Sequence, residues 1–194
     1  MGTFRRVCVY CGSSNQTVAR YGAAATALGR TLATRGIGVV YGGGSVGLMN
    51  AVAQGALDAG GEVIGVIPEK LQELELGRAD LTELHIVKGM HARKQRMADL
   101  SDAFIALPGG YGTLEELFEA TTWTQLAYHR KPVGLLNLDG FYDHLVAFLR
   151  RAVEDGFIKP IHADLIAVSA DADDLLAQLA SAQIPELHRW IDNP

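Results

Sequence analysis

Residues 102–120 read DAFIALPGGYGTLEELFEA, in which a short apolar run meets a helix-like run across three glycines in four positions. The run before Pro108 is apolar without polar alternation, as in a strand that is buried on both faces of a sheet. From Thr113 onward the apolar residues recur at helical spacing. A strand, a glycine-rich turn and a helix in this order are typical of a doubly wound α/β sheet, and this stretch predicts that fold class.

The same alternation of short apolar runs and longer helical segments extends along the chain. Six further strands are predicted from RRVCVY, GIGVVYGG, GEVIGVIP, ELHIVK, KPVGLLN and DLIAVS. Helices are predicted over Thr17–Arg35, Val46–Ala59, His91–Asp102, Thr113–His129, Phe141–Asp155 and Asp171–Ala182, and an irregular loop over Gln72–Thr82. No linker or fixed repeat interrupts the pattern. Residues 1–194 are therefore expected to form a single Rossmann-like domain, with a mostly parallel sheet and helices on both faces.

The composition restricts the kind of partner. The formal net charge is −5 and the pI is about 5.6, so no bulk positive field favours nucleic acid or an anionic membrane. No apolar run approaches the ~20 residues that span a bilayer, and the apolar part of the N-terminus is too short for a signal peptide. We expect a cytoplasmic protein that binds a small molecule, without a nucleic-acid or membrane partner.

The two cysteines, Cys8 and Cys11, form a C-x-x-C pair in and just after a predicted strand. A redox pair would lie at the start of a helix, where the dipole lowers the pKa of a thiol. A zinc site would need further ligands, and the chain has no second cysteine pair. We therefore expect buried structural thiols and no metal site.

The turn YGGGSVGLMN, residues 41–50, matches two motifs. Gly42, Gly44 and Gly47 fit the dinucleotide pattern G-x-G-x-x-G, but this pattern also requires an acid about 20 residues further on, at the end of the next strand. Glu62 begins that strand and Glu69 follows it, so neither fits well. The simplest interpretation is a tight turn that lets the backbone approach a ligand or the sheet.

The same turn also reads as G-x-S-x-G around Ser45, the nucleophile elbow of α/β-hydrolases. Asp139 and His162 follow in the required order, although an acid and a histidine follow most serines by chance. Too few strands precede Ser45 for the usual hydrolase fold, which makes a serine hydrolase the weaker alternative.

The turn PGGYGTLEE has two opposing properties. Its glycines allow backbone N–H groups to converge on one point at a helix start, where a phosphate is favoured. Thr113-x-x-Glu116 also fits a capping box, in which the glutamate bonds back to the helix N-terminus. Glu115 reads as an exposed acid. From the residues alone, capping is favoured over catalysis for Glu116. CGSSN, residues 11–15, fits either a helix cap or a phosphate contact.

The segment GMHARKQRM, residues 89–97, places Arg93 and Lys94 near the start of a predicted helix. Cations at this end oppose the helix dipole, which suggests that an anion compensates them. Arg96 reads as part of a solvated face.

Taken together, MHARKQRM, LPGGYGTLEELFEATTW and KPVGLLN resemble the LONELY GUY (LOG) family of cytokinin riboside 5′-monophosphate phosphoribohydrolases. CVYCGSS, YGGGSVGLMN and GFI agree, so the resemblance extends from about Val7 to Ile158. It implies a Rossmann-like homodimer without a cofactor. This enzyme would hydrolyse the N-glycosidic bond of an N6-modified adenosine 5′-monophosphate to free base and ribose 5-phosphate. Family members are often labelled lysine decarboxylases, yet nothing in this sequence marks a lysine that binds pyridoxal phosphate.

The resemblance also implies site residues. Arg93 and Glu116 would be catalytic, Glu75 and Thr122 would lie near the base and ribose, and Thr121 is an alternative to Thr122. The other implied nucleotide contacts are Lys94, Gly109, Gly110, Tyr111, Gly112, Thr113, Leu114 and Glu115.

The implied reaction explains why a phosphate turn carries acids. Cleavage of an N-glycosidic bond passes through an oxocarbenium-like transition state, which a carboxylate near C1′ would stabilise. A glutamate in the first turn of a helix is expected to favour its ionised form, which suits this role. Two alternatives share the motifs or the fold: a nucleosidase acting on AMP or other monophosphates, and a carrier of a nucleotide or of the molybdenum cofactor without turnover.

Overall fold

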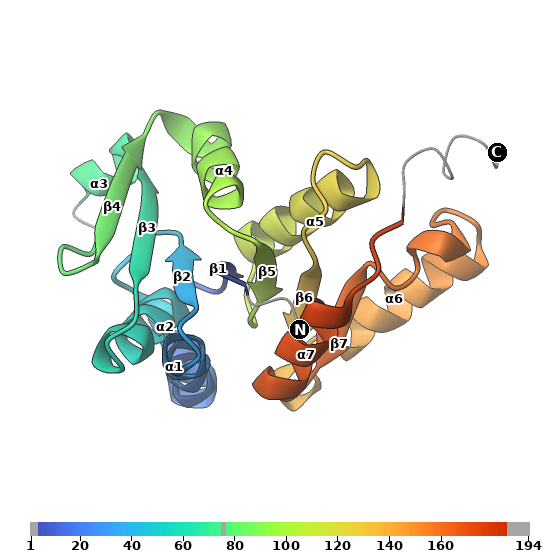
Figure 1. The fold of residues 1–194 in the computed structure, drawn as a ribbon, viewed down its shortest axis with the longest axis horizontal. Helices are drawn as coiled ribbons and strands as arrows, with labels where there is room; N and C mark the ends of the chain where they lie inside the picture. The colour runs from blue at the N-terminus through green and yellow to red at the C-terminus, as the bar shows by residue number, and fades with distance from the viewer. Residues whose placement is uncertain (1–3, 75–76, 186–194) are drawn as a thin grey trace.

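The computed structural model describes residues 4–74 and 77–185, which build one seven-stranded sheet (Figure 1). All strand pairs are parallel, and the strand order is β4-β3-β2-β1-β5-β6-β7. The strands are β1 (Arg6–Tyr10), β2 (Gly38–Tyr41), β3 (Val63–Pro68), β4 (Glu83–Val87), β5 (Ala103–Ala106), β6 (Val133–Leu136) and β7 (Ile166–Ser169). The predicted doubly wound α/β class is confirmed, with a sheet that is parallel throughout.

Helices cover both faces of this sheet (Figure 1). On one face, α1, α2 and α7 pack against the strands, and on the other face α4 and α5 do so, with α6 at the side of β6 and β7. The helices are α1 (Val18–Thr34), α2 (Gly47–Asp58), α3 (Glu69–Glu73), α4 (Gly89–Asp99), α5 (Tyr111–Gln125), α6 (Asp143–Glu154) and α7 (Ala172–Ser181). None of the helices in the described ranges is long and apolar enough to cross a membrane.

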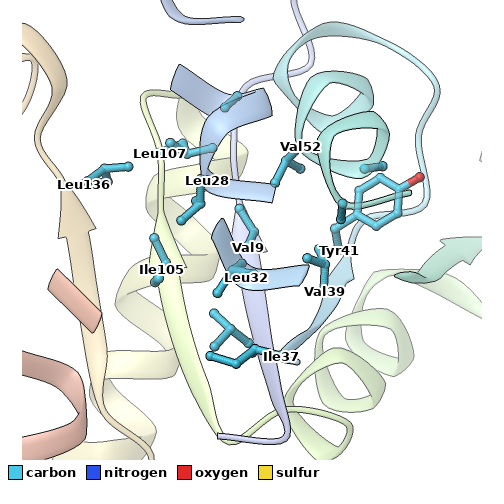
Figure 2. Packing of buried hydrophobic residues seen from close by; sticks show 14 of the residues in the cluster. Val9, Leu28, Leu32, Ile37, Val39, Tyr41, Val52, Ile105, Leu107 and Leu136 are labelled. Carbon is cyan, nitrogen blue, oxygen red and sulfur yellow. The ribbon is translucent and has the colours of Figure 1, made fainter. Parts of the chain in front are cut away.

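The larger apolar cluster lies under α1. Figure 2 shows Leu28 and Leu32 of α1 lying over Val9, Val39 and Ile105 of three neighbouring strands. These side chains are almost fully buried, and each buried aliphatic side chain of this size stabilises the fold by roughly 1.5–3 kcal/mol. The apolar runs read from the sequence as doubly buried strands are therefore the centre of the molecule.

Several helix boundaries differ from the sequence-based expectation by one to four residues, and two differences bear on the site. Helix α3 occupies Glu69–Glu73, at the start of the segment that was expected to be irregular. Helix α5 begins at Tyr111, two residues before the expected Thr113, and its N-cap is Gly110. The second difference decides how the acidic residues of α5 are oriented.

The loop after α3 is held by specific contacts although it is irregular. Gly77 pairs with Gly44 in an isolated antiparallel bridge, and the buried guanidinium of Arg78 binds Asp80, Asn50 and Gln54. This network anchors the loop to the start of α2.

The strand order reverses between β1 and β5, because β1 continues to β2 on one side and β5 continues to β6 on the other. In open parallel sheets, the crevice at such a switch point, beyond the carboxyl ends of the strands, is where ligands bind. Residues 11–15 and 107–112 follow these two strands, so a ligand is expected to bind beside them.

Helices α1 and α2 pack closely because glycines lie at their contact. A Cβ atom on Gly29 would overlap the carbonyl oxygen of Val52, and one on Gly55 would overlap that of Thr26. Backbone therefore touches backbone at this crossing.

We predict that Gly55→Ala lowers the free energy of unfolding by about 1–3 kcal/mol, because the added methyl group forces the two helices apart. Helix propensity acts in the opposite direction by roughly 0.5–1 kcal/mol. Urea denaturation measures the result. The matched control is Gly112→Ala in α5, where a Cβ atom meets nothing within 4 Å. Equal stability of the two variants would contradict the packing argument.

Candidate active site

A cavity of about 410 Å³ opens at the switch point, between the turns that follow β1, β2 and β5. It has a polar side formed by Ser13, Arg93, Thr113 and Glu116 and by the glycines of the turns. Its apolar side is formed by Val9, Val46, Met49, Ile67 and Leu71. No sequence motif pointed to this apolar wall, because its members come from four separate segments.

Arg93 reaches the cavity from the first half of α4 and is nearly buried. Its guanidinium donates Nε–H to the carbonyl oxygen of Val66 at 3.1 Å and Nη2–H to that of Gly42 at 3.3 Å. Nη1 donates to Oε1 of Glu116 at 3.1 Å. A Cβ atom on Gly42 would collide with Nη2, so this glycine makes room for the guanidinium. Three of the five N–H groups of Arg93 are thus used, and the other two have no acceptor among the residues that the structure describes.

Glu116 lies on the second turn of α5, with only 8% of its surface exposed. Its side chain pairs with Arg93 and makes no bond to the helix N-terminus, and no side chain caps that end. The capping-box prediction is therefore wrong, because α5 begins two residues earlier than expected and Glu116 falls outside the capping position. The anion expected to compensate Arg93 is this carboxylate.

Burial raises the pKa of Glu116, and the charge of Arg93 opposes that rise. The pKa of this carboxyl is thus shifted in the opposite direction to that expected for a solvated glutamate in the first turn of a helix. Loss of hydration on a nearly buried carboxyl disfavours the charged form more than the neighbouring guanidinium favours it. Glu116 is consequently able to hold or release a proton closer to neutral pH than a solvated glutamate.

The N-terminus of α5 is open to the cavity. Within the described part of the chain, the N–H groups of Tyr111, Gly112 and Thr113 have no protein acceptor, as expected for the first turn of an uncapped helix. A Cβ atom at Gly110 or Gly112 would meet nothing within 4 Å, so the missing side chains leave free space in front of these donors. This end of α5 can accept an anion of phosphate size.

The base of this turn is fixed by hydrogen bonds to neighbouring elements. The N–H of Gly12 donates to the carbonyl oxygen of Pro108 at 3.1 Å, and the hydroxyl of Tyr142 donates to that of Leu107 at 2.6 Å. The backbone of this turn is therefore tied to the turn after β1 and to the residue that precedes α6.

The other glycine-rich turn uses its donors internally. At the start of α2, Gly47 N–H donates to Oδ1 of Asn15 and Leu48 N–H donates to the carbonyl oxygen of Gly12. Gly47 has a φ of 60° and lies against the backbone of Ser13, which explains its identity. With these donors occupied, the match to the dinucleotide motif reflects packing between two turns.

The serine-hydrolase alternative is not supported. Asp139 pairs with Arg20, and neither ring nitrogen of the buried His162 has a partner in the described ranges. Strands β2 and β7 are four strand spacings apart, or about 19 Å at ~4.8 Å each. Ser45 follows the carboxyl end of β2, whereas His162 precedes the amino end of β7, so the two also lie at opposite ends of the strands.

Lys94 does not line the cavity, although it follows Arg93 directly. It is nearly buried, and its ammonium binds the carboxylates of Glu115 and, at 3.0 Å, Glu119. Leu114 packs against the apolar cluster beneath α5. A pyridoxal-phosphate enzyme needs a lysine in its active site to bind the cofactor. No lysine of the described ranges lines this cavity.

The two threonines expected near the base and ribose are separated from the cavity. Thr122 is exposed on α5, and Thr121 lines a different groove beside α6. Glu75 lies outside the described residues. Tyr111 does line the cavity, with 95% of its surface exposed at the entrance.

Both cysteines are free thiols; Cys8 is buried as expected, whereas Cys11 is only partly buried and lines the cavity. Burial raises the pKa of both Cys8 and Cys11, which keeps the thiols protonated and poorly nucleophilic. Within the described ranges, no group of three or more histidine, cysteine or acidic residues has the geometry of a metal site.

Comparison with known proteins shows which family the chain resembles over most of its length. Residues 49–179 match the family model described as "Possible lysine decarboxylase". The chain is 54% identical over 176 residues to the probable cytokinin riboside 5′-monophosphate phosphoribohydrolase LOGL5 of Oryza sativa subsp. japonica, covering 91% of this chain and 72% of that protein. It is 52% identical to LOG3 of Arabidopsis thaliana, covering 91% and 82% of the two chains.

Among solved structures, the molybdenum cofactor binding protein of Rippkaea orientalis superposes with a TM-score of 0.69 at 25% identity, over 91% of this chain and 95% of that one. The sequence identity to LOGL5 and LOG3, 54% and 52%, is about twice the 25% identity to this solved structure. The chain therefore belongs to the LONELY GUY (LOG) family.

Proposed function

We propose that the protein is a single-domain phosphoribohydrolase that cleaves the N-glycosidic bond of N6-modified adenosine 5′-monophosphates. The products would be the free base and ribose 5-phosphate. The observation that carries this proposal is the nearly buried Arg93–Glu116 pair, which lies in the same cavity as the open N-terminus of α5. The relatives LOGL5 and LOG3 are named for this activity.

The 5′-phosphate would bind at the N-terminus of α5. The N–H groups of Tyr111, Gly112 and Thr113 supply donors, and the helix dipole favours the negative charge. Binding energy from the phosphate then positions the ribose without contact to the bond that breaks.

Glu116 would act at C1′. As the bond to the base lengthens, positive charge develops on the ribose, and the carboxylate stabilises it. The carboxylate also removes a proton from the attacking water, whose oxygen bonds to C1′. The electron pair of the broken bond leaves on the glycosidic nitrogen, and the departing base takes up a proton. Water is the only co-reactant.

Arg93 would orient Glu116 and bind the substrate. Its anchoring by the carbonyl oxygens of Val66 and Gly42 leaves it little freedom, so the carboxylate paired with it is also held in place. The two remaining N–H groups are available to a ribose hydroxyl, the phosphate or the base.

Two alternatives remain testable. A nucleosidase acting on unmodified AMP would use the same cavity. A carrier function without turnover has the likeness to the molybdenum cofactor binding protein in its favour, but it provides no role for the buried Arg93–Glu116 pair.

We predict that Glu116→Gln lowers turnover roughly a hundred-fold or more, since the variant loses both the charge and the base. Its affinity for ribose 5-phosphate should change little. Incubation with AMP and with isopentenyladenosine monophosphate, followed by chromatography of the released base, measures turnover and separates the two substrates.

The matched control is Asp99→Asn, an exposed acid in the last turn of α4, which should retain wild-type turnover. Release of no free base from any monophosphate by the wild-type protein would exclude both enzyme functions and favour the carrier.

We predict that Gly112→Ala weakens binding of ribose 5-phosphate on the order of tenfold, equivalent to ~1.4 kcal/mol, because the methyl group enters the space assigned to phosphate. Its unfolding temperature should not fall, since the residue lies in a helix and the methyl group meets no protein atom. Calorimetry with ribose 5-phosphate and thermal denaturation measure the two effects. Unchanged affinity would place the phosphate elsewhere.

We further propose a homodimer formed through α6. None of the residues of this amphipathic helix is fully buried, and Phe148 is 64% exposed. A groove of about 900 Å³ runs beside it, and α5 contributes Thr121 to the wall. A second copy related by a two-fold axis would cover these apolar surfaces on both chains. On α5, Ala120 and Thr124 are buried in the core, and Leu126 is exposed. A nucleotide contact from Thr122 would be possible only to a neighbouring copy.

We predict that Phe148→Glu converts the dimer to a monomer in sedimentation equilibrium, because the charge would be buried without a partner. Ile86→Glu is the matched control, on the exposed edge strand β4 at the other side of the sheet. Dissociation of the control alone would instead indicate pairing through the strand edge.

We propose a cytoplasmic location, as expected from the sequence. The two cysteines are both free, which suits a reducing compartment.

A further inference from the structure

A second buried arginine, Arg78, lies beside the cavity without lining it. Only 7% of the residue is exposed, and it belongs to residues 77–82 of the connection between α3 and β4. Its guanidinium donates Nε–H and one Nη2–H to the two carboxylate oxygens of Asp80 at 2.5 and 2.8 Å. The other N–H groups donate to Gln54 at 2.6 Å and to the side chain and backbone carbonyl of Asn50 at 2.9 and 3.3 Å. All five N–H groups of Arg78 are thus used, so this arginine offers no donor to a ligand.

The partners of Arg78 lie next to the apolar wall of the cavity. Asn50 is in the first turn of α2, directly after Met49 of that wall. The backbone N–H of Arg78 donates to the carbonyl oxygen of Gly43 at 3.0 Å, in the turn that also carries Val46 of the wall. Arg78 therefore holds its loop against the turn after β2 and the start of α2, which supply part of the wall.

The same loop also contacts the α3 side of the wall. Gly77 bridges to Gly44 and lies so close to Gln72 of α3 that a Cβ atom on Gly77 would overlap the Oε1 atom of that side chain. Gln72 directly follows Leu71, the wall residue that α3 contributes. A helix of five residues is not stable by itself, so its position depends on contacts of this kind. The loop that Arg78 anchors therefore supports the wall on both the α2 and the α3 side.

We propose that Arg78 is a positioning residue that sets how tightly the cavity binds the base of the nucleotide and its N6 substituent. The polar side of the cavity is assigned to phosphate and ribose, so the base faces the apolar wall. Close packing against the base requires that Met49 and Leu71, which come from separate segments, are held in place. This inference rests on the proposed hydrolase function.

An apolar wall distinguishes ligands by the contact that it makes with them. A hydrophobic pocket discriminates between ligands that differ by one methylene group by roughly ten- to two-hundred-fold. The N6 substituent is distant from the bond that breaks, so a displaced wall weakens binding of the substrate and of the transition state equally. A loss of this kind raises KM and leaves kcat unchanged.

The test compares isopentenyladenosine monophosphate, AMP and ribose 5-phosphate in Arg78→Met. For isopentenyladenosine monophosphate we expect KM to rise about tenfold or more, while kcat stays within about twofold of wild type. The affinity for AMP, measured by calorimetry, should fall less, since AMP lacks the N6 substituent. The affinity for ribose 5-phosphate should stay within about twofold of wild type, because this ligand has no base and is bound at the N-terminus of α5.

Arg6→Met is the matched control. Arg6 is also largely buried, with 14% of its side chain exposed, and donates two N–H groups to Glu62 at 2.6 and 2.8 Å. It lies at the amino end of β1, whereas the cavity lies at the carboxyl ends of the strands. A merely structural role of Arg78 predicts that both variants lower the unfolding temperature and retain the wild-type KM. Our proposal predicts a raised KM in Arg78→Met alone.

Asp80→Ala provides a second variant if Arg78→Met does not fold. The side chain of Asp80 is 64% exposed, and its loss removes two acceptors of the same guanidinium. This variant should raise the KM for isopentenyladenosine monophosphate by a smaller factor than Arg78→Met.

Equal losses of affinity for all three ligands would overturn the proposal, and so would an unchanged KM in both variants. Wild-type protein that binds the monophosphates without releasing base would refute the proposed function. In that case the calorimetric affinities of the three ligands would still decide whether Arg78 positions the wall.

Discussion

A buried guanidinium requires acceptors on every side, and this requirement explains much of the site. Arg93 meets it with two carbonyl oxygens from the ends of β2 and β3 and with the carboxylate of Glu116. An arginine left unpaired in this position would cost several kcal/mol, so these partners are held in place together. The pair thereby connects both halves of the sheet across the switch point.

The two glycine-rich turns use the missing side chain of glycine in different ways. In the turn after β2, glycine allows protein atoms to approach closely: Gly42 admits the guanidinium, and Gly47 lies against the turn after β1. In the turn after β5, a Cβ atom on Gly110 or Gly112 would meet no protein atom within 4 Å, and we propose that a phosphate occupies this space. Similar sequence patterns thus mark packing in one turn and binding in the other.

The acids that follow the proposed phosphate turn do not conflict with anion binding, because each of them is paired with a cation. The free N–H groups face the cavity at the start of α5, while Glu115 and Glu119 are neutralised by Lys94 and Glu116 by Arg93. The local charge presented to an anion is therefore smaller than the sequence suggests. Burial also raises the pKa of Glu116, which is consistent with the general-base role proposed for it.

The sequence by itself determined the fold class and the order of the strands and the longer helices, and its resemblance to a known family indicated both residues of the central pair. Apolar runs such as DAFIA are local signals of doubly buried strands, and the spacing of Arg93 and Glu116 within two motifs indicated a known family. The sequence did not determine the partners of Lys94, the apolar wall of the cavity or the environment of Glu116. Those depend on where α4 and α5 cross, and on a helix start that lies two residues earlier than expected. Each involves contacts between segments far apart in the chain, which no local pattern encodes, so only the tertiary structure decided them.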